Sequence, residues 1–559
     1  MTNINAATNT NTTPPQTIKQ SISNDKTVIA LVSEFDGPDQ NQLGVSRIIA
    51  EQLNEAVKDY QDIKIQRIPE IVQNYSDAAE KCNQYGASLI LWGSYSKSQT
   101  NVRMNVHFEL LRPPNKLRVH RYNETFVKSI NELNRFSVQE TLSGKMTHLV
   151  FLAAGLMRFS ARDYDGAIRF YNQAIRFSQH FAANAGFENV YLYRGIAHSQ
   201  KAEYWDAIAD FDKALKLQRK YCLAHLLIAD DLVELGKVSA AVDKYHLAIT
   251  CDPTAVGAHN NLAIAYQILG RQQLAIDSVS KAIAIGGPDK SGFLSNRAAI
   301  LIVVRRFNEA REDLQNALKL DPNAKLATYN LGLLELQNGN TLEAKRQFEE
   351  VIEMTTKDDS EESGFSQEVK AGAYNGRGLI YKFSERYDDA LKDFNEAIRL
   401  NPSYPDPYIN RGFLLTKRHE YDSALADLNT AIKLNPLSDA AFCNRGVAYR
   451  EMGDYSRAKA DFDEAIRIDP DEAESHDNLG LLFTAQKKYD EAIVQFNIAI
   501  NLDPNVHYAY KERGDVWFYK GEYESAIKDY KKALLLKRDN AAALISMERA
   551  SRKLAGGDR

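Results

Sequence analysis

From residue 371 onward, the small and apolar residues of the chain recur with a period of 34 positions. Segments that begin at residues 371, 405, 439 and 473 follow one another without a gap, and another begins at residue 507. In each segment the apolar positions mark one face of two successive helices joined by a short turn. Followed backwards, the same frame finds segments that begin at residues 148, 188, 222, 256, 291 and 325. The pattern predicts eleven helix-turn-helix repeats.

Small and bulky residues alternate at fixed positions of each repeat. Position 20 is alanine in all eleven repeats, and position 8 is always glycine or alanine. Position 24 of the last five repeats is bulky instead, as Phe394, Leu428, Phe462, Phe496 and Tyr530. A small residue opposite a bulky one lets two helices interdigitate closely. Prolines near the repeat ends stop the second helices, because proline cannot continue a helix.

This pattern, with proline at position 32, resembles the tetratricopeptide repeat family over residues 148–540, which is about 70% of the chain. The resemblance implies a mostly α fold, in which helix pairs stack into a superhelical solenoid. Residues 541–559 then correspond to a capping helix and tail. The frame breaks at the acidic segment 359–370. We expect a loop there, between six repeats over 148–358 and five repeats over 371–540.

Arginine at position 7 and aspartate at position 23 occur in the same six repeats, and the other five repeats have neither. A random choice would give this match in about one arrangement of 460, and residues that vary together are expected to touch. An arginine fork can meet a carboxylate with two parallel hydrogen bonds. We therefore predict six structural pairs, with ligand binding by these arginines as the alternative. The pairs are Arg194 with Asp210, Arg297 with Asp313, Arg377 with Asp393, Arg411 with Asp427, Arg445 with Asp461, and Arg513 with Asp529.

The part before the repeats follows a different pattern. Residues 1–25 are polar and predict a disordered tail. Residues 26–127 predict a small α/β domain of order βαβαββ, with an apolar run at 28–32 and clean alternation at 101–111. Its segments "KTVIALVSEFDGPDQNQLG" and "YGASLILWGSYSKSQTNVRMNVHFEL" resemble the amino-terminal domain of the TolB family, which implies an interaction module. Residues 128–147 are expected to form a linker helix.

Composition narrows the classes of function. The net charge of −5 does not favour nucleic-acid binding, although the basic residues between 96 and 128 leave a phosphate contact as an alternative to a solvated sheet face. The four cysteines lie far apart in the sequence and suggest reduced structural thiols. No secretory or membrane-spanning pattern is found, so a cytoplasmic location without membrane insertion is expected. The chain shows no catalytic, metal or cofactor motif, and we expect no enzyme.

The remaining function is binding of a protein or peptide. In the resembled family, first-helix positions 2, 5, 6, 9 and 12 line a concave groove. Position 9 is mostly apolar, and amides at position 6 can bond an extended peptide backbone, although asparagine is also a common family residue there. The candidate binding residues are Asn410, Asn444, Asn478, Asn330, Asn375 and Arg450.

Some members of the resembled family hold the carboxylate tails of chaperones with lysine at position 5 and asparagine at position 9. Lys511 occupies position 5 of the last repeat, but Asp515 occupies position 9. The sequence therefore favours an apolar or mixed ligand, and its binding should depend only weakly on salt. A general scaffold or adaptor is one hypothesis. The alternative is a sensor or regulatory subunit of a bacterial signalling or defence system that acts on a separately encoded enzyme.

Overall fold

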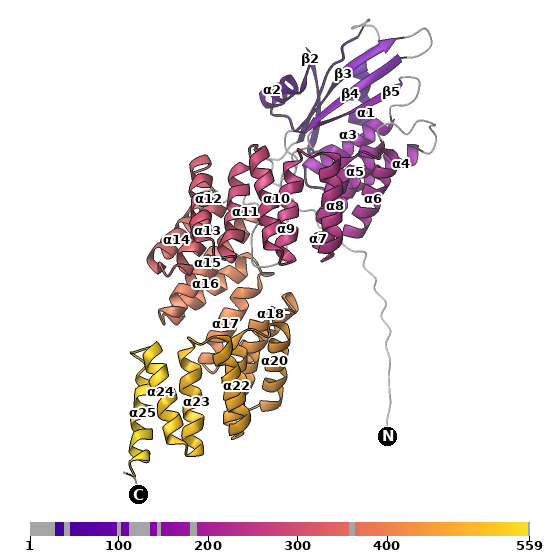
Figure 1. Cartoon of the computed structure of the whole chain (residues 1–559). Helices are drawn as coiled ribbons and strands as arrows, with labels where there is room; N and C mark the ends of the chain where they lie inside the picture. Colours follow the sequence, from indigo (N-terminus) through magenta and orange to yellow (C-terminus); the bar gives the residue numbers. More distant parts are fainter. Residues whose placement is uncertain are drawn as a thin grey trace, which may run out of the picture. The chain divides into compact units, whose positions relative to one another are not determined.

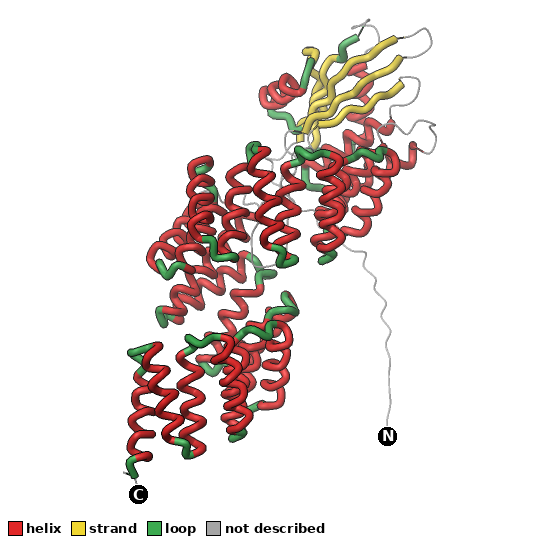
Figure 2. The backbone as a smooth tube through the Cα atoms, viewed as in Figure 1, coloured by secondary structure: helices red, strands yellow, loops and turns green. Residues whose placement is uncertain are grey.

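A computed structural model describes residues 28–37, 45–97, 102–110, 135–141, 147–178, 187–356 and 364–556 of the chain. A small α/β domain is followed by a series of paired helices (Figures 1 and 2), which confirms the predicted fold class. The contacts divide the chain into two compact units, one that extends to Ala258 and one that begins at His259. Each unit is described by itself below. The predicted polar tail at residues 1–25 lies outside the described residues.

The α/β domain contains a five-stranded mixed sheet in the order β2-β1-β3-β4-β5. Strand β1 (Val28–Glu34) pairs in parallel with β2 (Ile63–Ile71) and β3 (Leu89–Lys97), whereas β4 (Val102–Leu110) is antiparallel to β3. The two crossovers are α1 (Val45–Ala56) and α2 (Tyr75–Tyr85). Leu31, Ile90 and Trp92 pack with Ala78 and Cys82 of α2, so β1 and β3 form the centre of the domain core.

The fifth strand corrects the predicted linker helix at 128–147. Residues Arg135–Thr141 form β5, which pairs antiparallel with β4 in a register that sets Val138 opposite Val106 and Phe136 opposite Phe108. The segment alternates between apolar and polar residues, as a strand does, and β5 satisfies the backbone groups that β4 would otherwise leave unpaired. The domain therefore extends beyond residue 127.

One buried arginine joins this domain to the first repeat. Arg158, in α3 (Thr147–Ser160), is 8% exposed, and its Nη1 donates hydrogen bonds of 2.8 Å to both carboxylate oxygens of Asp62. Its Nε donates to Asp163 at 2.7 Å, and its guanidinium lies 4.4 Å from the ring centroid of Tyr60. A cation held by two carboxylates and a ring is fully compensated for its burial.

The repeats follow as antiparallel pairs of first and second helices. The first helices are α3, α5 (Phe187–Gln200), α7 (Cys222–Glu234), α9 (Val256–Ile268), α11 (Lys290–Val303), α13 (Lys325–Gln337), α15 (Gly364–Phe383), α17 (Pro405–Lys417), α19 (Asp439–Glu451), α21 (Ala473–Ala485) and α23 (His507–Lys520). The second helices are α4 (Tyr164–Ser178), α6 (Tyr204–Leu217), α8 (Val238–Cys251), α10 (Gln272–Ile285), α12 (Phe307–Leu320), α14 (Thr341–Thr356), α16 (Tyr387–Leu400), α18 (Tyr421–Leu434), α20 (Tyr455–Ile468), α22 (Tyr489–Leu502) and α24 (Tyr523–Leu536). Helix α25 (Ala541–Leu554) packs on α24 at the end of the series.

The pairing of small and bulky residues explains how each helix pair closes. A Cβ added to Gly446 at position 8 would lie 2.6 Å from the ring of Phe462 at position 24, and the same holds for Gly378 and Phe394. That distance is shorter than any normal carbon contact, so the bulky ring occupies the space that glycine leaves. Phe394 and Phe462 are fully buried.

The structure corrects the predicted loop at 359–370. Helix α15 begins at Gly364, so residues 364–370 are helical. Val369 is fully buried in one cluster with Val351 of α14 and Tyr329 of α13, which explains why this part of the segment is folded. Helices α14 and α15 contact each other directly. The packing of repeats therefore continues across residues 357–363, and the predicted division into two stacks at this point is wrong.

The expectation of four reduced cysteines is also wrong. Cys222 and Cys251 form a disulfide with a Cα–Cα distance of 5.4 Å, whereas Cys82 and Cys443 are buried thiols. Cys222 begins α7 and Cys251 ends α8, and an antiparallel helix pair brings these two ends together. Disulfides are rare in a reducing cytosol, so this bond counts against the predicted cytoplasmic location.

Candidate binding surface

The six arginine–aspartate pairs each join the first and second helices of one repeat. We refer to the face on which they lie as the second-helix face. In every pair the arginine Nε and Nη2 donate to the two carboxylate oxygens of the aspartate at 2.6 to 2.8 Å, as in Arg445 with Asp461. The aspartates are buried, and Asp461 is 6% exposed. Its hydrogen bond raises the pKa of Arg445. Both charges of a pair are thus used within the fold, which leaves this face without a free anchor for a ligand.

Each arginine of these pairs also reaches the preceding repeat, which the sequence comparison missed. The Nη1 of Arg445 donates to Asn429 of α18 at 2.6 Å, and that of Arg513 donates to Asn497 of α22 at 2.5 Å. The partner is always position 25 of the repeat before: Asn172, Ser280, Glu349, Asn395, Asn429 and Asn497. Asparagine stands at position 25 ahead of four of the six arginine repeats and ahead of none of the others, which is a signal that the sequence does contain.

The first-helix face differs, and three of the predicted binding residues there are buried. Asn330 is 3% exposed and donates to the carbonyl of Ser295 at 2.9 Å. Asn375 is buried as well, and it accepts a hydrogen bond from Asn410 and donates one to the hydroxyl of Tyr404, both at 3.2 Å. These amides join neighbouring first helices, so they have no exposed group for a ligand.

Asn478 is also buried, at 8% exposed, and its Nδ2 donates to the carbonyl of Glu474 at 3.1 Å, whereas the other three candidates, Asn410, Asn444 and Arg450, are half-buried. Lys382 of α15 donates to Asn410 at 3.0 Å, and Arg450 of α19 donates to Asn478 at 3.1 Å. A cation at position 12 thus bonds an asparagine at position 6 of the next repeat. Asn444 has no such cation; it is half-buried, and its Nδ2 donates to the carbonyl of Ala440 in its own helix at 2.9 Å.

The apolar residues at position 9 are accessible only in part of the chain. Leu156, Ile196 and Ile264 are buried, at most 3% exposed, whereas Val447 and Leu481 are half-buried. Accessible apolar side chains therefore occur on α17, α19 and α21, and accessible amides on α17 and α19. We refer to the face formed by these helices and by the first helices on either side, α15 and α23, as the first-helix surface.

Several groups on the first-helix surface are desolvated although solvent reaches them. Burial lowers the pKa of Lys382, which is half-buried, and raises the pKa of Glu474, which is exposed. A charged group behaves this way when protein surrounds it without covering it, as on an inward-curved wall. Interactions with charged partner groups are stronger in such a place than on a flat surface.

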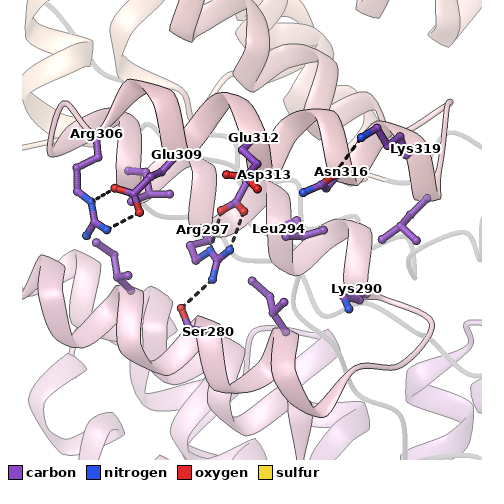
Figure 3. A pocket seen from close by; sticks show the side chains of 14 residues that line it. Ser280, Lys290, Leu294, Arg297, Arg306, Glu309, Glu312, Asp313, Asn316 and Lys319 are labelled. Atoms are coloured by element: carbon purple, nitrogen blue, oxygen red, sulfur yellow. Dashed lines mark hydrogen bonds and ion pairs between the residues drawn. The ribbon is translucent and has the colours of Figure 1, made fainter.

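A pocket of about 580 Å³ lies between α10, α11 and α12 of the second unit. Figure 3 shows that most of its charged side chains have partners within the pocket: Arg297 bonds Asp313 and Ser280, Arg306 bonds Glu309, and Lys319 bonds Asn316. It is therefore a weaker candidate than the first-helix surface, since little of its charge is left for a ligand.

Across the parts of the chain that the structure describes, one group of side chains has donor atoms close enough for a metal ion: His198, Glu203 and Asp206. Glu203 is already bonded by His198 at 2.7 Å and by Lys201 at 2.6 Å. No second feature marks this group as a metal site. Within the same described parts, no helix is long and apolar enough to cross a bilayer.

Models of a known protein family match part of the repeat region. Models of the tetratricopeptide repeat match residues 297–359, 371–404, 440–472, 473–506 and 507–540. Residues 297–540 therefore carry tetratricopeptide repeats. The resemblance of the amino-terminal domain to the TolB family stays a prediction.

Curated relatives match the repeats as well. The chain is 25% identical to human tetratricopeptide repeat protein 6 over 38% of this chain and 39% of that protein. It is 33% identical to serine/threonine-protein phosphatase 5 of Mus musculus over 17% of this chain and 18% of that protein. It is 32% identical to the Hsp70-Hsp90 organising protein of Plasmodium falciparum over 19% of this chain and 42% of that protein. The chain thus spans less than half the length of each of these relatives.

Two solved structures are similar at low identity. The crystal structure of the APC/C hetero-tetramer Cut9-Hcn1 aligns with 72% of this chain and 96% of its own at 14% identity and a TM-score of 0.37. A tetratricopeptide repeat protein from Parabacteroides merdae aligns with 47% of this chain and 98% of its own at 18% identity and the same TM-score.

Proposed function

We propose that this protein is a protein–protein interaction scaffold that binds an extended segment of a partner on the first-helix surface. The observation that carries the proposal is the coincidence, on α17 to α21, of half-buried apolar side chains with an amide that is not committed to a neighbouring helix. Asn444 and Val447 lie one turn apart on α19 and are both half-buried. An amide beside an apolar side chain can hold the backbone of a peptide and one of its side chains together.

The tetratricopeptide relatives support a binding role, because their similarity lies in repeats and not in a catalytic segment. The match to phosphatase 5 covers only 18% of that enzyme. The geometry differs from a lysine–asparagine clamp for carboxylate tails, since Lys511 bonds Asp515 at 2.8 Å. We therefore propose that the protein is not an enzyme and that its ligand is not a carboxylate tail.

The proposal is tested by capture of partners on the immobilised full-length protein, measured by quantitative mass spectrometry. We expect the double variant Asn444→Ala/Val447→Gln to lose most of the partner that the wild type retains. The change removes one amide and makes one apolar contact polar. Val447 is half-buried at the edge of the cluster that contains Phe462 and Leu479, so the melting temperature of the variant is measured together with capture.

The matched control is Asn501→Ala/Val494→Gln, which makes the same two changes on α22, where both residues are exposed. The control should capture partners like the wild type, and both variants should melt within a few degrees of it. Equal capture by Asn444→Ala/Val447→Gln and the wild type would place binding elsewhere on the molecule.

A further inference from the structure

A buried carboxyl group on the first-helix surface lacks the partners that other buried acids in this protein have. Asp477 of α21 is 5% exposed, and its Oδ1 atom is fully buried and accepts no hydrogen bond from any described residue. A buried polar atom without a partner costs free energy, typically about 1 to 3 kcal/mol. Such an atom calls for an explanation beyond the stability of the fold.

The groups around Asp477 are mostly acidic. Burial is the main cause that raises the pKa of Asp477 to about 8, and repulsion from Glu512 of α23 and Glu474 of α21 adds to it. Burial likewise raises the pKa of Glu512 and of Glu474. The carboxyl groups of two neighbouring repeats therefore face the same space.

The cations near this group are already engaged. Arg450 of α19 donates to Asn478 and to Glu451, both at 3.1 Å. Lys511 of α23 lies 2.8 Å from Asp515 and donates to Glu512 at 3.3 Å. Both cations lower the pKa of Asp477 through space, but neither is bonded to it.

The other described titratable groups on adjacent elements do not donate to Oδ1 of Asp477. Burial and the charge of Asp477 raise the pKa of Tyr508 on α23, which therefore faces the same space without bonding Oδ1. His476, the neighbour of Asp477 on α21, bonds Gln495 of α22 at 2.9 Å. Lys382 of α15 acts on Glu474 from a distance and donates its hydrogen bond to Asn410.

We propose that Asp477, with Glu512 and Glu474, forms the site for a lysine or arginine side chain of the bound partner segment. This inference rests on the proposed function and adds the chemistry of one ligand position. A cationic side chain would pair with the accessible carboxylates of Glu474 and Glu512, and its charge would stabilise the ionised form of the buried Asp477 beside them, a gain that is larger on a desolvated wall than in water. A divalent metal ion is a poorer occupant, because among the described residues these carboxylate oxygens do not converge within 4.8 Å of one another.

The test selects peptides from a random displayed library on the immobilised full-length protein and then titrates the enriched peptide by fluorescence anisotropy. We expect the enriched peptides to share one lysine or arginine position. Replacing that residue by glutamine should weaken binding to the wild type by about tenfold or more. The variant Asp477→Asn/Glu512→Gln should bind both versions of the peptide equally, at the weaker affinity. Glu512→Gln alone should reduce the preference in part.

The matched control, Asp422→Asn/Glu548→Gln, removes the same charge at exposed positions of α18 and α25. It should keep the full preference for the basic residue, which separates a local site from attraction by net charge. Affinity for the basic peptide should also rise as the pH increases through 8, because Asp477 must ionise to pair with a cation. The glutamine version should show no such rise.

The outcomes distinguish the two proposals. If the library yields no binding peptide, the proposed function fails. If it yields peptides without a shared basic position, or if Asp477→Asn/Glu512→Gln keeps the preference, the function stands and the acidic site is refuted.

Discussion

The second-helix face of the repeats and the first-helix surface bury carboxyl groups in opposite ways. Asp461, 6% exposed, accepts two hydrogen bonds from the guanidinium of Arg445. Asp477, 5% exposed, has a buried oxygen with no donor, and acids are its strongest charged neighbours. The extent of burial is the same, and the partners differ. Burial alone therefore does not identify a structural acid; the donors around it decide whether its charge serves the fold or is left for a ligand.

The largest effect that separates the two faces should come from breaking the Arg445–Asp461 pair. Asp461→Ala leaves a buried cation without its carboxylate and should lower the free energy of unfolding by about 3 kcal/mol. Arg445→Ala should also destabilise, and the double variant should cost less than the sum of the two. Chemical denaturation of the full-length protein, with hydrogen exchange at α19 and α20, measures the cycle. Strictly additive effects would show that the two charges do not depend on each other.

Removal of the charge of Asp477 should instead raise the free energy of unfolding. Its folded pKa of about 8 lies well above the value of about 4 for an unfolded aspartate, so the folded protein binds more protons between these two pH values. The stability of the wild type should therefore fall as the pH rises from about 4 to about 8 and stay constant above that range. Asp477→Asn does not titrate, so its advantage in stability over the wild type should grow across this range and be complete above pH 8.

The measurement for Asp477 is a series of melting temperatures across this pH range, without any partner present. Below about pH 4, where the carboxyl of the wild type is neutral in both the folded and the unfolded state, Asp477→Asn and the wild type should melt together. Asp422→Asn, on the exposed face of α18, should show no crossing of this kind. A variant that is less stable than the wild type at every pH would mean that Asp477 has a structural partner.

What the sequence could predict depends on whether a feature recurs in several repeats. The repeats of one chain provide an internal comparison, so the partner of Arg445 was predictable from which repeats carry aspartate at position 23. The fold class followed from the period of 34 residues for the same reason. The position 25 partner was readable in principle, because Asn429 and Asn497 precede arginine repeats, but it requires comparison across the boundary between repeats.

Other features had no such internal reference. The strand β5 is a short alternating segment that appears once, and its assignment depends on the open edge of β4. Cys222 and Cys251 are separated by 29 positions, and only the helix hairpin brings them together. The environment of Asp477 depends on Glu512 of the next repeat and on the depth of burial, neither of which a residue pattern contains. Features that occur once in the chain, or that depend on contacts between residues far apart in the sequence, are thus the ones that sequence reasoning misses.

The smallest expected effect tests whether the arginine–aspartate pairs also join one repeat to the next. Asn429 accepts a hydrogen bond from Nη1 of Arg445 and is itself exposed, so Asn429→Ala should cost only about 0.5 to 1 kcal/mol. Asn501→Ala, at an exposed position of α22, should cost less. The decisive comparison is in the Arg445→Ala background, where Asn429→Ala should have no further effect on chemical denaturation. An undiminished effect there would show that Asn429 stabilises α18 by itself. Loss of the effect would mean that the arginine links two successive repeats, as a residue that serves the fold should, in contrast to Asp477.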